Sequence, residues 1–197
     1  MSAQADSGSG PAPVRIVVGY GFWIFLLSDI ILFSALFATY AVLRGQTNGG
    51  PSGHELFELR HAGIETVCLL FSSYTCGLAI LSIERRRLSA FYACCALTFI
   101  LGAVFLGLEL SEFLGLVARG AGPSRSAFLS AFFSLVGLHG AHVTVGLVWL
   151  IFLVAQTRYR GALDYVRRRL LCFSLFWHAL DIIWVALLSM VYLMGAR

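Results

Sequence analysis

The hydrophobic residues of this chain gather in five long runs separated by short polar segments. The runs cover residues 19–43, 63–83, 89–110, 127–157 and 170–194. Crossing the hydrocarbon core of a bilayer takes about 20 residues of helix, and each run is long enough to do so. Strands of a membrane barrel alternate apolar and polar residues over about ten positions, and these uninterrupted runs do not. The pattern therefore predicts an all-α integral membrane protein, in which a bundle of five transmembrane helices occupies residues 19–197.

The composition agrees with this prediction. Of the 197 residues, 59% are hydrophobic and 12% are charged, whereas a soluble domain carries about 25% charged residues. The first 18 residues differ from the rest, because "MSAQADSGSGPAPV" at 1–14 is small, polar and rich in Gly, Pro and Ser. Such a segment buries too little apolar surface to fold, so a disordered tail is predicted for residues 1–18.

The arginines predict how the bundle is oriented. If each run crosses the membrane once, the tail and the 84–88 and 158–169 loops share one side and carry nine of the fourteen arginines. The positive-inside rule then places the N-terminus in the cytoplasm and the C-terminus in the periplasm. Orientation and anionic lipid headgroups account for the basic loops, so no nucleic-acid partner is expected.

Ionisable side chains at membrane depth are costly and are therefore functional candidates. The candidates, together with a neighbouring indole, are Asp29, Glu65, Glu112, His139, His142, His178, Asp181 and Trp184. Counting about 1.5 Å per residue from the cytoplasmic end of each helix places Asp29, His178 and Asp181 near the midplane, with His142 somewhat above them. His139 and His142 are three residues apart, so they are expected on one helix face.

These residues allow three interpretations. The first is a haem or di-metal site that uses His139, His142 and His178. Against it, Glu109 and Glu112 are expected at the outer end of the third run, above His178, and no helix carries a Glu-x-x-His pair. The second is that the histidines form hydrogen bonds across helices and hold the packing. The third is a small transporter with Asp29 and Asp181 as proton carriers, although the sequence has no inverted repeats.

Three stretches resemble subunit III of the haem–copper oxidases, in particular that of the bacterial cytochrome bo-type ubiquinol oxidases. They are "GFWIFLLSDIILFSALFATYAVLRG" (21–45), "GPSRSAFLSAFFSLVGLHGAHVTVGLVWL" (122–150) and "CFSLFWHALDIIWVALLSMVYLMG" (172–195). The patterns HGxHVxxG and WHxxDxxW, each in its own membrane helix, make the resemblance specific. It extends from about residue 20 to the end of the chain.

The resemblance implies a non-catalytic subunit of a proton-pumping terminal quinol oxidase of aerobic respiration, in the bacterial cytoplasmic (inner) membrane. The chain itself would bind no haem and no copper, since these belong to catalytic subunit I, its expected partner among the other oxidase subunits. In the family this subunit stabilises subunit I, holds phospholipid in a cleft between two helix groups and favours proton uptake.

The resemblance also concerns single residues. It implies that Asp29 stands where the family has a buried carboxylate, usually Glu. The other residues at recurrent family positions are Glu112, His139, His142, His178, Asp181 and Trp184. The five predicted helices match the quinol oxidase form, since cytochrome c oxidase members typically have seven, but subunit III of a cytochrome c oxidase stays open as an alternative.

Overall fold

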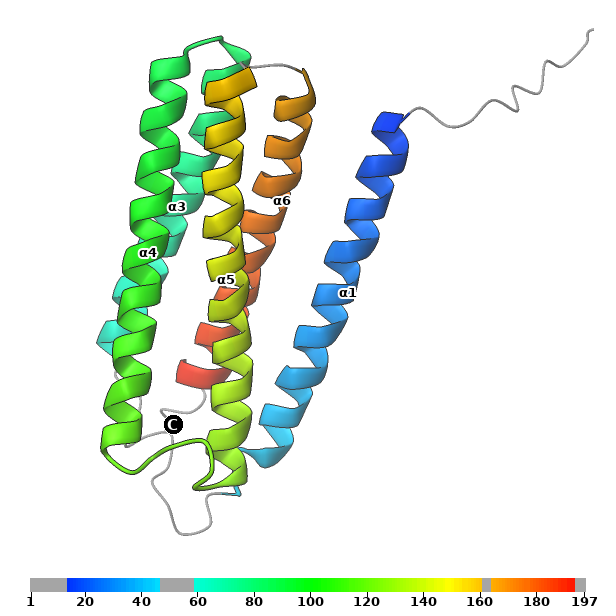
Figure 1. Cartoon of the computed structure of the whole chain (residues 1–197). Helices are drawn as coiled ribbons and strands as arrows, with labels where there is room; N and C mark the ends of the chain where they lie inside the picture. Colours follow the sequence, from blue (N-terminus) through cyan, green and yellow to red (C-terminus); the bar gives the residue numbers. More distant parts are fainter. Residues whose placement is uncertain (1–13, 47–58, 161–163, 194–197) are drawn as a thin grey trace, which may run out of the picture.

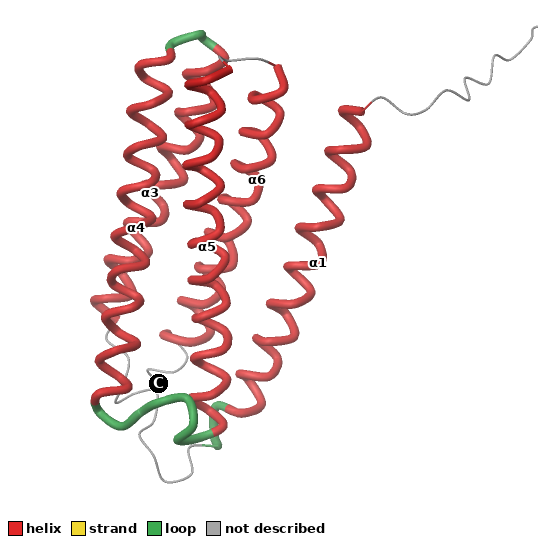
Figure 2. The backbone as a smooth tube through the Cα atoms, viewed as in Figure 1, coloured by secondary structure: helices red, strands yellow, loops and turns green. Residues whose placement is uncertain are grey.

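The computed structural model of the chain is built of helices alone in the part that it describes, residues 14–46, 59–160 and 164–193 (Figures 1 and 2). The helices are α1 (Val14–Leu43), α3 (Leu59–Glu84), α4 (Leu88–Ala118), α5 (Ala127–Arg160) and α6 (Asp164–Leu187), and α6 continues into the π-helical turn η1 (Leu188–Leu193). Among the described residues, five helices are long and apolar enough to cross a membrane. The predicted all-α architecture with five spans is therefore confirmed.

The helices are longer than the hydrophobic runs that predicted them. α4 continues to Ala118, eight residues beyond the predicted end, and closes on Arg119, after which Gly120 adopts a φ of 74°. α1 begins at Val14, so a disordered tail reaching residue 18 is wrong for residues 14–18, while residues 1–13 lie outside the described part. Hydropathy marks only the length that lies in hydrocarbon, whereas backbone hydrogen bonding continues until a residue interrupts it.

Four helices form a tight bundle and the fifth leans away from it. α3 and α4 form a hairpin whose turn contains Arg86 at a φ of 55°, and α5 and α6 pack beside them. The two ends of α1 differ, because its C-terminal end meets α5 while its start stands apart from the bundle (Figure 1). Only 11% of the residues in the 18-residue apolar stretch of α1 are buried, against 56% of those in the corresponding stretch of α6. α1 therefore offers most of its apolar surface to lipid or to another protein.

The core is filled by aromatic rings that lie against glycines. The indole of Trp177 on α6 is wedged between α4 and α5, where a β-carbon at Gly102 or Gly146 would come within 3.1 and 2.7 Å of it. The indole N–H donates to Ser72 Oγ on α3 at 3.0 Å. Because there is no hydrophobic force between helices in lipid, close packing and hydrogen bonds of this kind contribute much of what holds a membrane bundle together.

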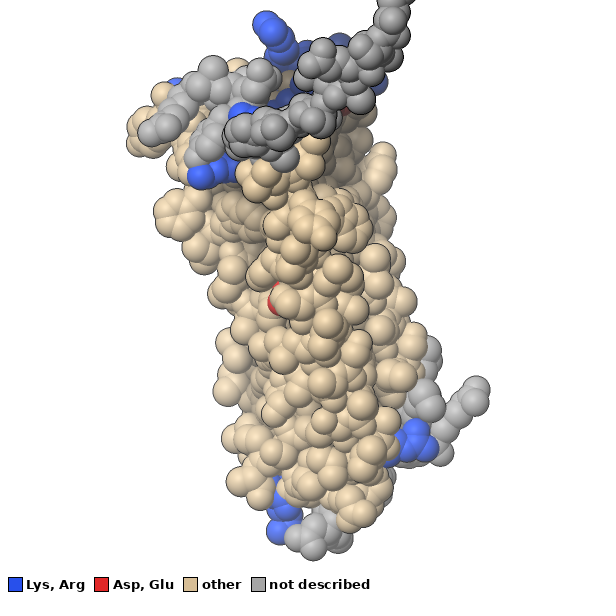
Figure 3. Space-filling view, turned by 90° about the vertical axis from the view of Figure 1, so that its right-hand side faces the viewer, with Lys and Arg blue, Asp and Glu red and all other residues tan. Residues whose placement is uncertain are grey.

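The distribution of charge fits a membrane-embedded bundle. Arginine side chains gather at the two ends of the molecule, and the band between them is almost wholly free of charge on the face shown in Figure 3. The start of α1, the α3–α4 turn and the start of α6 lie at the same end (Figure 1). The arginine count of the sequence assumed that these segments share one side of the membrane. We call this end of the bundle the arginine-rich end.

Candidate functional site

Asp29 of α1 lies beside His142 of α5, with 3.8 Å between its Oδ1 and the imidazole Nε2. The other ring nitrogen, Nδ1, lies 2.8 Å from the carbonyl oxygen of Leu138 one turn earlier on α5. Both side chains are largely buried, with 15% and 17% of their surface exposed. The sequence placed His142 above the level of Asp29 and could not say which groups face each other. The structure brings these two to one level and pairs them.

His139 lies one turn before His142 and is fully buried. Its imidazole packs against the rings of Phe33, Phe105 and Trp184, with centroids 6.4, 5.8 and 5.3 Å away. Phe33 of α1 also contacts His142, at 5.3 Å, which agrees with the prediction that both histidines share one helix face. Among the described residues His139 has no hydrogen-bond partner. It therefore joins α1, α4 and α6 through ring packing, while the polar contact across helices belongs to His142.

Carboxyl groups from two helices gather in the half of the bundle away from the arginine-rich end. Glu65 of α3 is fully buried and Glu109 of α4 is 4% exposed, and both interact electrostatically with Glu112 of α4. Glu112 accepts a hydrogen bond of 3.0 Å from the Tyr192 hydroxyl of η1. A β-carbon at Gly140 of α5 would lie 2.6 Å from a Glu109 oxygen, so the glycine makes room for this carboxyl group. Glu109 was predicted at a helix end, but it lies inside α4 because that helix continues to Ala118.

The remaining predicted residues lie on α6 and do not join this cluster. Asp181 is 8% exposed and lies next to Ser73 and Cys76 of α3. His178 is on the exposed side of the same helix. Trp184 is buried and its indole N–H donates to Thr66 Oγ1 of α3 at 3.0 Å. The predicted band of Asp29, His178 and Asp181 is thus divided between the α1–α5 contact, the outside of α6 and the α3–α6 contact.

Within the described part of the chain, no three or more His, Cys, Asp or Glu side chains are grouped so that they could hold a metal ion. The geometry explains this for the histidines that a haem or di-metal site would use. His139 is enclosed by aromatic rings, His142 faces Asp29, and His178 is on the exposed side of α6. These buried histidines and carboxyl groups can hold neighbouring helices together, and the carboxyl groups can bind protons.

Several polar contacts were not predicted from the sequence. They are the Trp177–Ser72 and Tyr192–Glu112 hydrogen bonds and the 2.7 Å contact between the hydroxyls of Thr75 and Thr98. For the two contacts that involve α3, the available signal was the row of small polar residues in that helix, at positions 66, 72, 73 and 75. Such residues in a membrane helix commonly form hydrogen bonds to a neighbouring helix.

Comparison with known proteins shows to which family this chain belongs. The family model for cytochrome c oxidase subunit III matches residues 2–196. The chain is 52% identical over 177 residues to "Cytochrome bo(3) ubiquinol oxidase subunit 3" of Pseudomonas aeruginosa, covering 90% of this chain and 85% of that protein. It is 47% identical to the protein of the same name in Pseudomonas putida, covering 89% and 84%. It is 45% identical to "Quinol oxidase subunit 3" of Bacillus subtilis, covering 98% and 97%. The chain belongs to the cytochrome c oxidase subunit III family.

Proposed function

We propose that this chain is subunit III of a proton-pumping quinol oxidase and performs none of the redox chemistry itself. The observation that carries the proposal is its similarity, over nearly its whole length, to subunits named for quinol oxidases in both Pseudomonas and Bacillus. The five spanning helices agree with it. The complex would oxidise a quinol and reduce oxygen to water, with haem and copper held by catalytic subunit I.

The buried polar groups support an auxiliary role. Asp29 and His142 face each other, Glu112 accepts a hydrogen bond from Tyr192, and Trp184 donates to Thr66. Each of these contacts joins two helices of this chain. Polar groups used in this way stabilise the bundle. A haem or metal centre would instead need side chains that are available to coordinate the metal.

The surface of α1 supports assembly with another oxidase subunit. Its exposed apolar residues include Trp23, Ile24, Ile31 and Val42, with exposed fractions of 52–77%. Since lipid and a neighbouring transmembrane helix are equally apolar, α1 can meet either without cost. We propose that α1 contacts catalytic subunit I and thereby stabilises it. The membrane would be the bacterial cytoplasmic membrane, with the arginine-rich end toward the cytoplasm.

An affinity tag on this chain tests the proposal. Membranes are solubilised in mild detergent, the tagged chain is captured, and the captured material is examined by mass spectrometry and absorption spectroscopy. The proposal predicts a haem–copper catalytic subunit in the eluate, with a haem spectrum and quinol-dependent oxygen consumption. Capture of the folded chain without any oxidase subunit, under conditions that preserve oxidase activity in the membrane, would contradict it.

A further inference from the structure

Three carboxyl groups lie together in the half of the bundle away from the arginine-rich end. They belong to Glu65 of α3 and to Glu109 and Glu112 of α4, and we call them the carboxyl cluster. Glu65 is fully buried and Glu109 is 4% exposed, whereas Glu112 is half-buried. Glu65 and Glu109 interact electrostatically with each other and with Glu112. The cluster therefore gathers three ionisable groups inside the bundle, and none of the hydrogen bonds described above involves Glu65 or Glu109.

The two buried members of the cluster lack compensating partners. Among the described residues, neither oxygen of Glu65 has a hydrogen-bond partner, and neither does Oε2 of Glu109. No Arg or His side chain in the described part of the chain forms an ion pair with either residue. Tyr192 of η1 is the further titratable group that interacts with all three carboxyl groups, and its hydroxyl donates to Glu112. The oxygens of Glu65 and Glu109 therefore point to a ligand that can donate hydrogen bonds.

The chemistry of carboxyl groups limits what this ligand can be. An ionised carboxylate only accepts hydrogen bonds, so two of them cannot bond to each other unless a proton or a water molecule lies between them. If all three groups were ionised, unpaired like charges would share an apolar interior, which is very costly. A bound proton removes one charge and supplies a donor, and a buried water molecule can connect several polar oxygens. The cluster thus has the donor and acceptor pattern of a site for a shared, hydrated proton.

The neighbouring helices shape a space for the cluster. A β-carbon at Gly140 of α5 would lie 2.6 Å from Oε1 of Glu109 and 2.8 Å from Oε2, so a side chain there would displace this carboxyl group. One turn earlier on α4, Phe105 is fully buried and packs against Trp184 of α6 with the ring centroids 4.7 Å apart. The two rings lie on the side of the cluster that faces the arginine-rich end. They separate the carboxyl groups from the middle of the bundle.

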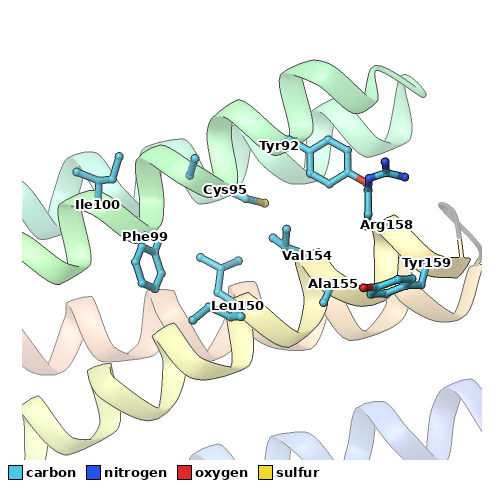
Figure 4. A pocket seen from close by; sticks show the side chains of 11 residues that line it. Tyr92, Cys95, Phe99, Ile100, Leu150, Val154, Ala155, Arg158 and Tyr159 are labelled. Carbon is cyan, nitrogen blue, oxygen red and sulfur yellow. The ribbon is translucent and has the colours of Figure 1, made fainter.

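The cluster is also closed toward the arginine-rich end by the packing of α4 on α5. Near that end the two helices separate around an apolar groove of about 680 Å³, whose lining includes Leu150 and Arg158 (Figure 4). Between this groove and the cluster, Gly102 of α4 meets Leu147 of α5, where a β-carbon on the glycine would be 2.9 Å from the leucine side chain. In the other direction, the half-buried Glu112 lies about 9 Å before the end of α4. Exchange with solvent is therefore expected through Glu112.

We propose that the carboxyl cluster binds protons as one site. Glu65 and Glu109 share a proton through buried water, and Glu112 exchanges it with the surface away from the arginine-rich end. When a proton leaves, the remaining negative charge is spread over the carboxyl groups and is stabilised by the Tyr192 hydroxyl. Asp29 is not part of this site, because it lies on α1 and faces His142. The site belongs to this chain alone and does not depend on the oxidase that the chain joins.

Infrared spectroscopy of the full chain tests this proposal, because a protonated carboxyl group and a carboxylate absorb at different wavenumbers. The purified chain is titrated with base in detergent, and the protonated-carboxyl band is compared between the unaltered chain and Glu109→Gln. The variant should lack part of the band that the unaltered chain shows at neutral pH, and this part should shift in heavy water. Glu84→Gln is the matched control, since Glu84 is an exposed carboxylate paired with Arg167, and it should leave the band unchanged.

Two further variants test whether the carboxyl groups act together. Glu65→Gln removes one like charge, so the rest of the cluster's band should disappear at a pH about one unit or more below that of the unaltered chain. Gly140→Ala should alter the Glu109 part of the band, whereas Gly137→Ala, whose β-carbon would meet only the Phe113 ring at 3.6 Å, should not. Circular dichroism checks the fold of each variant. Identical spectra of Glu109→Gln and the unaltered chain at every pH would overturn the proposal, and so would an unchanged midpoint in Glu65→Gln.

Discussion

Replacing Asp29 separates a structural role of this residue from a role in proton delivery. Because Nδ1 of His142 lies 2.8 Å from a carbonyl oxygen, which only accepts, Nδ1 carries a hydrogen. In a neutral ring, Nε2 then presents a lone pair toward the Asp29 carboxyl group. The two groups attract each other only when one of them holds an additional proton. Asp29→Asn replaces that proton with an amide N–H that can donate to His142 Nε2. Asp29→Leu offers no donor and leaves Nε2 facing carbon.

The expected cost of Asp29→Leu follows from this geometry. A polar contact between membrane helices contributes about 0.6 to 2 kcal/mol, and the 3.8 Å separation favours the lower half of that range. For a chain of this size, each kcal/mol shifts the midpoint of thermal unfolding by about 2–4 °C. We therefore expect Asp29→Leu to lower the midpoint by about 1–5 °C and to loosen α1 from the bundle. Asp29→Asn should stay close to the unaltered chain.

The assay is thermal unfolding of the purified chain in detergent, together with turnover of the assembled oxidase across pH. Ser34→Ala is the control, because Ser34 is exposed on the same helix and its hydroxyl donates only to the Ile30 carbonyl. Equal midpoints for the Leu and Asn variants would refute a structural role of the pair. Slower turnover of Asp29→Asn at high pH, with assembly intact, would instead assign Asp29 to proton delivery.

Three further predictions concern packing, topology and cofactors. Gly146→Ala brings a β-carbon to 2.7 Å from the rigid indole of Trp177, whereas Gly107→Ala meets nothing within 4 Å. The first variant should be less stable than the second by about 1–3 kcal/mol, and equal unfolding midpoints would contradict this. A reporter enzyme that is active only outside the cytoplasm should be active when fused after Arg197, and an expressed but inactive fusion would mean that the orientation is reversed. The chain purified alone should contain no haem and no stoichiometric iron, copper or zinc, and a Soret band that disappears in His142→Ala would show the opposite.

The number and nature of the helices could be predicted because both depend on local physics. A run such as 127–157 is apolar at almost every position, and a backbone in lipid can satisfy its hydrogen bonds within a helix. The helix ends were less predictable. α4 runs to Ala118 because nothing before Gly120 interrupts its hydrogen bonding, and hydropathy does not detect where hydrogen bonding stops.

Pairing of the polar groups depends on how helices rotate and tilt against one another. Depth along each helix suggested Asp29, His178 and Asp181 as one band, but α6 turns His178 outward and Asp181 toward α3. α1 approaches α5, so Asp29 meets His142. The rotation of α6 is set by Trp177 between Gly102 and Gly146, a three-helix contact whose partners are far apart in sequence. Spacing within one helix carries no information about such a contact.

We propose that this chain supports the oxidase without taking part in its redox chemistry. The most direct measurement is oxygen consumption with excess quinol, followed through prolonged turnover, for oxidase purified with and without this chain. We expect the same haem spectrum in both preparations, with lower complex stability or faster inactivation when the chain is absent. An altered haem spectrum, or a preparation without the chain that matches the complete oxidase in assembly, sustained turnover and high-pH activity, would contradict it.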